Sequence, residues 1–481
     1  MSDLPSRRSL DLSVLFSLLA LVLGAWVASV SLGRESLWLD ESYTWFFVRL
    51  PWTSLLPSAR IDAVNPPLYY ALVKVFVGSS APTEIALRLP SVLFHVAGTA
   101  AAMAIGATVA GRPGRVTAAW VWALHPMAVW YARDARPYAA AAALAAVTMA
   151  FFLRADRGAR PVAWVIGGAS MAAGLVTHYF FFVFAGTLVI ASLLSFRKRP
   201  TFFRSWSLLT LVALLPLAAW LVWFFQQGEP SLGIGWIQTP QVGDLGLTLW
   251  NMASGFGGRL DPMTTAFGAV IALLIGAAVV DPGQGLLARR YALTGVVLPL
   301  ACVWLVSLRR PVFVDRYFLI LLPWIVALAA LGAQSLVVRS VRHGTRAWMA
   351  APIVAAAIAL AASAQVHIAV KYQKEDWRGV GGYLEASGAT PASLVLSEPE
   401  LSLPLAYYGV VPSLAAVERL VPACGSRCWW ILRQPYTSTH AFTQSISDSD
   451  RPWIPAIPSG CRRASVWNSP TGVQVWELAC P

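Results

Sequence analysis

Long apolar runs alternate with short polar clusters along most of the chain. Each run is close to the roughly twenty residues that an α-helix needs to cross the hydrocarbon core of a bilayer. Eleven such windows lie at residues 11–32, 88–110, 114–131, 137–154, 161–177, 180–196, 206–226, 264–281, 291–308, 316–337 and 348–367. The pattern therefore predicts a polytopic α-helical membrane protein with about eleven transmembrane helices.

Basic residues fall on alternate connections between these windows. If the N-terminus is cytoplasmic, every cytoplasmic loop is basic, as the positive-inside rule requires. These loops contain Arg112 and Arg115; Arg154, Arg157 and Arg160; Arg197, Lys198, Arg199 and Arg204; Arg289 and Arg290; and Arg339, Arg342 and Arg346. Because the number of spans is odd, the C-terminal tail is then expected outside the membrane.

The segments outside the windows divide the chain into a membrane domain and a tail. Residues 1–366 form the predicted transmembrane domain, whose first external loop covers 34–87, and residues 367–481 form the tail. Within the loop, residues 66–78 are apolar but too short to span, so we expect a juxtamembrane helix started by proline. In the tail, a helical pattern at 376–386 and strand patterns at 393–397, 429–432 and 473–478 predict a small external α/β domain.

Composition and charge support this interpretation. Of the 481 residues, 57% are hydrophobic and 12% are charged, whereas about 25% are charged in soluble domains. The net charge of +13 lies in the connections between spans, and no basic stripe runs along a soluble segment. Because such charge serves membrane topology, no nucleic-acid partner is expected.

Four of the five cysteines lie in the tail, at Cys424, Cys428, Cys461 and Cys480. In an oxidising external compartment they can form two disulfides, although the sequence does not give their connectivity. A zinc half-site at Cys424 and Cys428 is the alternative, but no second CxxC motif or nearby histidine pair completes it.

An acidic pair, Asp40 and Glu41, lies just outside the end of the first window. Carboxylates and aromatic residues are common at a membrane boundary, where they are readily hydrated, so the pair alone does not indicate catalysis. Other polar clusters share this expected external side. They are Arg133, Asp134 and Arg136; Arg309, Arg310, Asp315, Arg316 and Tyr317; and His178 with Tyr179.

Each cluster has an ordinary structural explanation and a functional one. External arginines can extend toward the interface or pair locally, and they can also bind a phosphate through two hydrogen bonds. A carboxylate base, a cationic phosphate site and an apolar surround together suit transfer of a sugar from a polyprenyl phosphate. Direct displacement of the phosphate would invert the anomeric centre.

Several short motifs are similar to those of the GT-C membrane glycosyltransferases. The chain resembles the bacterial protein-mannosyltransferase-like group, glycosyltransferase family 39, and the related lipid A aminoarabinose transferases. The matching pieces are LWLDESYT at 37–44, NPPLYY at 65–70, RLPS at 88–91, YARDARPYA at 131–139, THYFFF at 177–182, RYFLILLP at 316–323 and YQKEDWRGVGGYL at 372–384. The resemblance covers almost the whole chain.

The resemblance implies a GT-C fold, a polyprenyl-phosphate-linked sugar donor and an external active site in a bacterial inner (plasma) membrane. It assigns Asp40 as the catalytic base and Glu41 to acceptor orientation or metal binding, with the two roles open to exchange. Arg136 and Arg316 are the expected donor-phosphate ligands, followed by Arg133 and Arg60. Further active-site candidates are Asn65, Tyr69, Asp134, Tyr138, His178 and Tyr179. Asn65 departs from the histidine that several relatives place before the paired prolines.

The sequence leaves the substrates and the metal open. The acceptor can be lipid A or another glycolipid, a polysaccharide or an exported protein, and a divalent cation such as Mg²⁺ or Mn²⁺ is possible. The KEDWRG motif is interpreted as a helix start and docking element, with Asp376 as the cap.

A transporter or flippase of a lipid-linked sugar is the main alternative, and an assembly subunit without chemistry is a second one. Transporters often contain internal repeats and midplane polar residues. The sequence shows no convincing repeat, and its charges collect at one expected face. This distribution favours a reaction at the surface.

Overall fold

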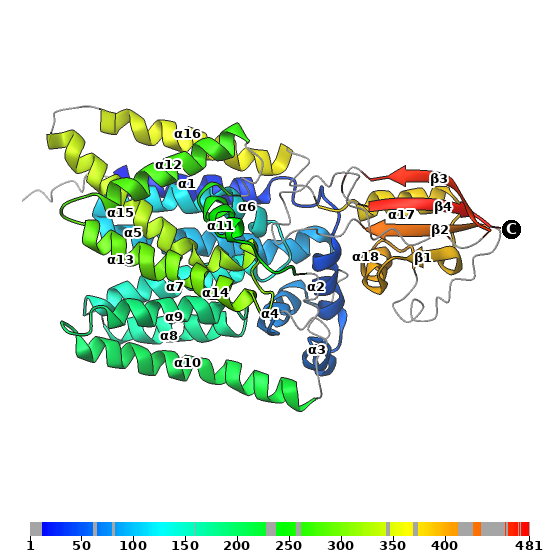
Figure 1. Cartoon of the computed structure of the whole chain (residues 1–481), viewed down its shortest axis with the longest axis horizontal. Helices are drawn as coiled ribbons and strands as arrows, with labels where there is room; N and C mark the ends of the chain where they lie inside the picture. The colour runs from blue at the N-terminus through cyan, green and yellow to red at the C-terminus, as the bar shows by residue number, and fades with distance from the viewer. Residues whose placement is uncertain are drawn as a thin grey trace, which may run out of the picture.

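The computed structural model describes residues 12–60, 65–78, 82–158, 160–227, 237–255, 261–342, 347–368, 374–411, 427–433, 457, 460–469, 471 and 473–480. A bundle of long helices forms one part of the molecule, and a small sheet with its helices lies beyond one end of the bundle (Figure 1). We call the described residues from 374 onward the C-terminal unit.

The bundle is built from helices that coincide with the eleven apolar windows. Its helical segments are α1 (Leu12–Ser29), α5 (Glu84–Ala123), α6 (Pro126–Ala132), α7 (Tyr138–Asp156), α8 (Pro161–Leu175), α9 (Phe181–Leu193), α10 (Pro200–Gln226), α12 (Pro262–Val279), α13 (Gly285–Ala292), η1 (Leu293–Val297), α14 (Leu298–Ser307), η2 (Asp315–Leu321), α15 (Leu322–Arg342) and α16 (Ala347–Ile368). The predicted fold class, a polytopic helical protein with a small C-terminal α/β part, is confirmed.

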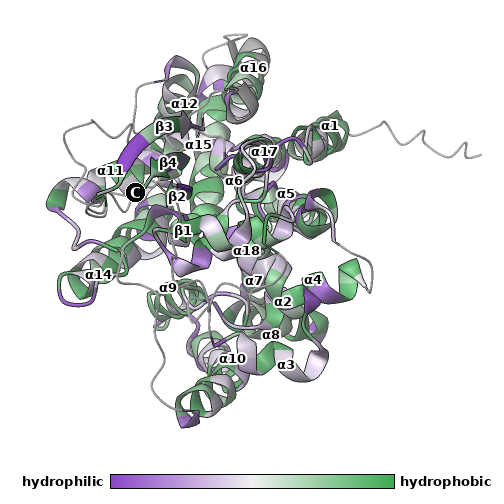
Figure 2. Ribbon diagram, turned by 90° about the vertical axis from the view of Figure 1, so that its right-hand side faces the viewer, coloured by the Kyte–Doolittle hydropathy of each residue, from purple (hydrophilic) through white to green (hydrophobic). Residues whose placement is uncertain are grey.

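In the described part of the chain, seven helices are long and apolar enough to cross a membrane, when α13, η1 and α14 are counted as one and η2 and α15 as another. Their outer faces expose large apolar side chains such as Phe16, Leu211 and Leu273. Seen from the end next to the C-terminal unit, α1, α10 and α16 are mostly apolar (Figure 2). Such a surface belongs in lipid, because water would penalise it.

Helix α5 contains the predicted window 88–110 and the first part of the window 114–131, which continues into α6. Its backbone turns at Ala110 and Gly111, and the φ angle of Gly111 is +61°, a conformation that favours glycine. A Cβ on Gly106 would lie 2.1 Å from the carbonyl oxygen of Gly114, so the backbones on the two sides of the turn touch. A 40-residue helix is about 60 Å long, twice the thickness of the hydrocarbon core, and the turn divides it into two segments.

Three short helices lie between the bundle and the C-terminal unit: α2 (Leu39–Arg49), α3 (Trp52–Ser58) and α4 (Leu68–Val77) (Figure 1). Helix α4 follows the paired prolines, as the apolar 66–78 segment predicted. Lys74 of α4 donates hydrogen bonds to the carbonyl oxygens of Val48 and Leu50, at 2.8 and 2.5 Å. This cation suits the C-terminal end of α2, where unpaired carbonyls concentrate negative potential.

The C-terminal unit contains α17 (Trp377–Ala386), η4 (Pro391–Ser393), β1 (Leu394–Leu396), η5 (Pro399–Leu401), α18 (Ser402–Tyr407), β2 (Arg427–Arg433), β3 (Arg462–Asn468) and β4 (Val473–Ala479). The sheet order is β1-β2-β4-β3, with β1 and β2 parallel and the other pairs antiparallel. The three strand patterns coincide with β1, β2 and β4. Strand β3 was missed because its side chains are mostly exposed and give no apolar alternation.

The start of α17 and the cysteines of the tail bear on two further sequence predictions. Asp376 caps α17 by accepting a hydrogen bond from the backbone N–H of Gly379 at 2.9 Å, as the KEDWRG motif suggested. Cys461 and Cys480 form a disulfide, and Cys428 is also disulfide-bonded. Cys424 lies outside the described residues. One more element, α11 (Val242–Ser254), packs against α12 and η2.

Candidate active site

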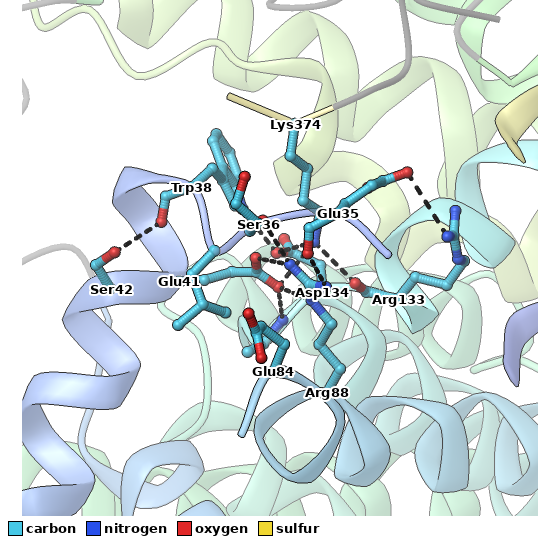
Figure 3. A network of polar contacts seen from close by, with 12 residues as sticks. Glu35, Ser36, Trp38, Glu41, Ser42, Glu84, Arg88, Arg133, Asp134 and Lys374 are labelled. Atoms are coloured by element: carbon cyan, nitrogen blue, oxygen red, sulfur yellow. Dashed lines mark hydrogen bonds and ion pairs between the residues drawn. The ribbon is translucent and has the colours of Figure 1, made fainter. Parts of the chain in front are cut away.

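Helix α2 places its two adjacent carboxylates in opposite environments. Glu41 is fully buried, and both of its oxygens are used. Oε1 accepts hydrogen bonds from Arg88 Nε at 2.7 Å, Lys374 Nζ at 2.7 Å and the backbone N–H of Ala135 at 2.9 Å, and Oε2 accepts from Arg88 Nη2 at 2.6 Å (Figure 3). Glu41 is therefore a buried carboxylate with hydrogen-bond donors at both of its oxygens.

A second carboxylate, Asp134, completes this buried cluster. It accepts hydrogen bonds from Trp38 Nε1 at 2.9 Å and Lys374 Nζ at 3.2 Å, and it is fully buried. Two cations, Arg88 and Lys374, thus balance two carboxylates. A buried charge is tolerated when it is paired and hydrogen-bonded in this way. We call Glu41, Arg88, Asp134 and Lys374 the ion cluster.

The two carboxylates of the ion cluster differ in proton affinity. Burial raises the pKa of Glu41, but Arg88 and Lys374 outweigh this effect and hold it at about 2. Burial raises the pKa of Asp134 to about 6, since Lys374 compensates it only in part and the charge of Glu41 adds to the rise. Glu41 is thus the ionised anchor of the cluster at neutral pH.

Arg88 also holds the chain that leads into α2. Its guanidinium donates hydrogen bonds to the carbonyl oxygens of Leu32 at 2.7 Å, Glu35 at 2.9 Å and Ser36 at 2.8 Å. One buried arginine of α5 therefore fixes both the entry to α2 and its second acidic residue. This arrangement determines which way the first turn of α2 faces.

Asp40 lies on a different side of α2, because consecutive residues of a helix point about 100° apart. Its side chain is 20% exposed, and Arg316 Nη2 lies 3.9 Å from its Oδ2. Arg136 Nη1 donates to the backbone carbonyl of Asp40 at 3.1 Å and to the hydroxyl of Tyr70 at 3.3 Å. Asp40 is thus the carboxylate of the pair that keeps accessible surface.

Aromatic rings surround the two arginines. The guanidinium of Arg316 lies 5.8 Å from the ring centres of both Tyr138 and Tyr317, and His178 lies 5.5 Å from the ring of Tyr138. Burial, together with Arg136 and Arg316, lowers the pKa of His178 to about 3. His178 is therefore neutral at physiological pH and can serve as a hydrogen-bonding group.

Helix α11 supports the arginine of η2. Asp315, the residue before Arg316, accepts hydrogen bonds from the side chains of Thr248 and Asn251. These contacts hold the start of η2, so the position of Arg316 depends on two polar side chains of α11. The supporting residues carry no sequence signal of their own.

The other predicted residues have their own contacts. Arg133 pairs with Glu35 at 3.6 Å, the hydroxyl of Tyr69 bonds to Ser91 Oγ at 3.0 Å, and that of Tyr179 accepts from Trp220 Nε1 at 2.9 Å. Arg60 lies over the ring of Phe224 at 5.4 Å. Asn65 is fully buried, and its amide makes no hydrogen bond to the described residues.

Sequence reasoning missed three residues that organise the site: Arg88, Lys374 and Glu375. Arg88 begins an apolar window, and an arginine at the start of a span can indicate function or an ion pair. Lys374 and Glu375 belong to the KEDWRG motif, which we interpreted only as a docking element. Their partners are distant in sequence, so no local pattern reveals these contacts.

The acidic pair does not fit a divalent cation held by both carboxylates. Arg88, Lys374 and Ala135 donate hydrogen bonds to the oxygens of Glu41, and a metal ion there would compete with these donors. The role of Glu41 in acceptor orientation or metal binding stays a prediction. Among the described residues, no group of three or more His, Cys, Asp or Glu side chains could hold a metal ion.

Comparison with known proteins finds similarity only among solved structures. Neither the scan of protein-family models nor the search of curated proteins gives a match. The chain is similar to ArnT from Cupriavidus metallidurans bound to undecaprenyl phosphate, with a TM-score of 0.49, 16% identity and coverage of 84% of this chain and 76% of that one.

A second similarity is to the Archaeoglobus fulgidus oligosaccharyltransferase. Its apo form has a TM-score of 0.49 and 13% identity, covering 87% of this chain and 69% of that one. For its complex with Zn and sulfate the TM-score is 0.42, and 57% of that chain is covered. The expected likeness to the aminoarabinose transferases and other GT-C enzymes thus appears in this comparison. Similarity at this level assigns no activity or site residue to the present chain.

Proposed function

We propose that the chain is an inverting glycosyltransferase that moves a sugar from a polyprenyl-phosphate donor to an acceptor hydroxyl at the external face of the membrane. The observation that supports this proposal is the environment of Asp40. Its carboxylate keeps accessible surface beside Arg316, and Arg136 bonds to its backbone. The neighbouring Glu41, in contrast, is buried in the ion cluster.

The reaction needs a base at the acceptor and positive charge at the leaving group. Asp40 removes the proton of the acceptor hydroxyl as its oxygen forms a bond to the anomeric carbon. The bond between that carbon and the phosphate oxygen breaks, and polyprenyl phosphate leaves with the bonding electron pair. Arg136 and Arg316 bind the phosphate oxygens through charge-assisted hydrogen bonds. A single displacement inverts the anomeric centre.

The assay for this activity uses the purified full-length protein with a panel of polyprenyl-phosphate sugars and membrane lipids. We expect loss of one donor, release of polyprenyl phosphate and a product of inverted anomeric configuration. Sugar-phosphate donor that crosses vesicle membranes without cleavage would instead identify a flippase. No donor loss with any acceptor, or retention of configuration, would reject the proposed reaction.

Replacing Arg316 with methionine should reduce kcat for donor cleavage by about 10²–10³-fold, because the loss of one donor that stabilises developing charge in a transition state has an effect of this size. The measurement is the initial rate of polyprenyl phosphate release. The matched control is Arg310→Met, which removes an exposed cation six residues away and should leave the rate unchanged. Equal rates in both variants would remove Arg316 from the site.

Chelation of divalent cations should leave donor cleavage unchanged. Arg136 and Arg316 supply positive charge beside Asp40, and both oxygens of Glu41 already accept hydrogen bonds from cationic side chains. The rate is measured before and after incubation with EDTA, followed by dialysis. A loss of rate that added Mg²⁺ or Mn²⁺ restores would contradict this assignment.

A further inference from the structure

The first residues of the C-terminal unit reach α2 from the far end of the sequence. Lys374 Nζ lies 2.7 Å from Glu41 Oε1 and 3.2 Å from Asp134 Oδ1, and it donates to the backbone carbonyl of Arg133 at 2.8 Å. Its side chain is only 1% exposed. Lys374 is therefore the cation that closes the ion cluster from the side of the C-terminal unit (Figure 3).

Glu375 caps the helix that carries Asp40. The residue at the N-cap position of α2, Trp38, makes no side-chain capping bond. Glu375 Oε2 instead accepts a hydrogen bond from the backbone N–H of Leu39 at 3.2 Å, and from Trp377 Nε1 at 2.7 Å. A carboxylate at this end satisfies an unpaired N–H group and opposes the positive end of the helix dipole.

Apolar contacts also join the start of α2 to the C-terminal unit. Leu39 is buried in the same core as Trp377, Val380 and Trp429 of the C-terminal unit. In addition, Ser36 Oγ donates to the backbone carbonyl of Glu375 at 3.0 Å. The residue before Asp40 is thus held in the core of the C-terminal unit, and the residue after it is held in the ion cluster.

We propose that Lys374 and Glu375 are positioning residues that fix the carboxylate of Asp40, so that the C-terminal unit is required for the chemical step and not only for binding an acceptor. The effect on rate depends on the function proposed above, whereas the effect on α2 does not. Lys374 acts by its charge, which balances Glu41 and Asp134, and Glu375 acts by capping α2.

The main test is Lys374→Met in the full-length protein. We expect kcat for donor cleavage to fall by about 10²-fold, because a displacement of about 1 Å at a reacting group has an effect of this size. The KM for donor should change less than kcat, since Arg316 comes from η2, to which no hydrogen bond or ion pair of Lys374 is seen among the described contacts. Hydrogen exchange should become faster in residues 39–49 but not in α7.

Companion variants separate a positioning role from a loss of folding. Arg378→Met removes a half-exposed cation that pairs with Glu84 at 2.7 Å and donates to the carbonyl oxygens of Arg34 and Gly33. It has no hydrogen bond or ion pair to α2 itself among the described contacts, so we expect a kcat and exchange in residues 39–49 much closer to wild type than in Lys374→Met. Lys374→Met/Asp134→Asn restores the charge balance and should recover part of both losses. Glu375→Gln keeps an acceptor oxygen and should retain more activity than Glu375→Leu.

Hydrogen exchange and the rate of donor cleavage test the positioning role and the proposed function separately. Wild-type kcat and unchanged α2 exchange in Lys374→Met would overturn the positioning role, as would an absence of recovery in the double variant. If Lys374→Met does not fold, Glu375→Gln is compared with Glu375→Leu by kcat and by hydrogen exchange in α2. The difference between these two variants then decides on the positioning role. If the wild-type protein cleaves no donor, the proposed function fails, and the exchange data alone test the coupling of α2 to the C-terminal unit.

Discussion

Replacing Asp40 with asparagine is expected to reduce kcat for donor cleavage by about 10³-fold, within the range that a general base contributes. Asparagine has nearly the same shape but cannot accept the proton of the acceptor hydroxyl. The folded state should change little, because the carboxylate is 20% exposed and its ion pair with Arg316 is long, at 3.9 Å. The measurement is the single-turnover rate of donor cleavage with saturating acceptor.

A suitable control is Asp261→Asn, because Asp261 caps α12 by accepting a bond from the N–H of Met263 at 3.1 Å and asparagine caps equally well. This variant should keep the wild-type rate. If Asp40→Asn is as active as Asp261→Asn, Asp40 is not the base.

Replacing Glu41 with glutamine should act mainly on the stability of the protein. The variant leaves Arg88 and Lys374 with Asp134 as the one remaining carboxylate of the ion cluster. Removing one partner of a buried ion pair typically lowers the free energy of unfolding by about 3–5 kcal/mol. Thermal unfolding in detergent, followed with the variant and wild type side by side, measures the loss.

Glu35→Gln provides the comparison for Glu41→Gln. Glu35 is less deeply buried than Glu41 and lies 3.6 Å from Arg133, so its loss should lower the free energy of unfolding by less than the loss of Glu41 does. Equal stability of the two glutamine variants would contradict the anchoring role of Glu41. The two acidic residues should also differ in what their variants lose. Asp40→Asn should lose catalysis while it stays folded, whereas Glu41→Gln should lose stability.

The helical architecture could be predicted because crossing a bilayer imposes a strong local requirement. Each span needs a long apolar run, and the two segments of α5 were separated by the polar cluster around Arg112 and Arg115. The strands of the tail were harder to predict. Strand β3, with the sequence RRASVWN, is stabilised by pairing with β4 rather than by an apolar face, so its residues give no clear pattern.

The roles within the acidic pair could not be predicted from the sequence. Asp40 and Glu41 are adjacent and chemically alike, and the difference between them comes from contacts with Arg88 and Lys374. Lys374 is separated from Glu41 by 333 residues, so no local spacing relates them. The sequence did place Asp40, Arg136 and Arg316 on one expected face, and the structure brings these three together.

Asp40 lies beside Arg136 and Arg316, and other contacts hold its helix in place. The ion cluster and the C-terminal unit hold the first turn of α2, while Arg136 and Arg316 approach Asp40 from two other elements. In the proposed reaction, Asp40 takes the proton while its neighbour Glu41 anchors the helix. The same scheme explains why charged residues of the tail reach into the site.

The most direct measurement is the fate of the anomeric carbon–phosphate bond in a single turnover of the wild-type protein with a polyprenyl-phosphate sugar and an acceptor. The account predicts that polyprenyl phosphate is released in the same amount as a glycoside of inverted anomeric configuration. Donor that remains intact while it crosses the membrane, or a product of retained configuration, would contradict it.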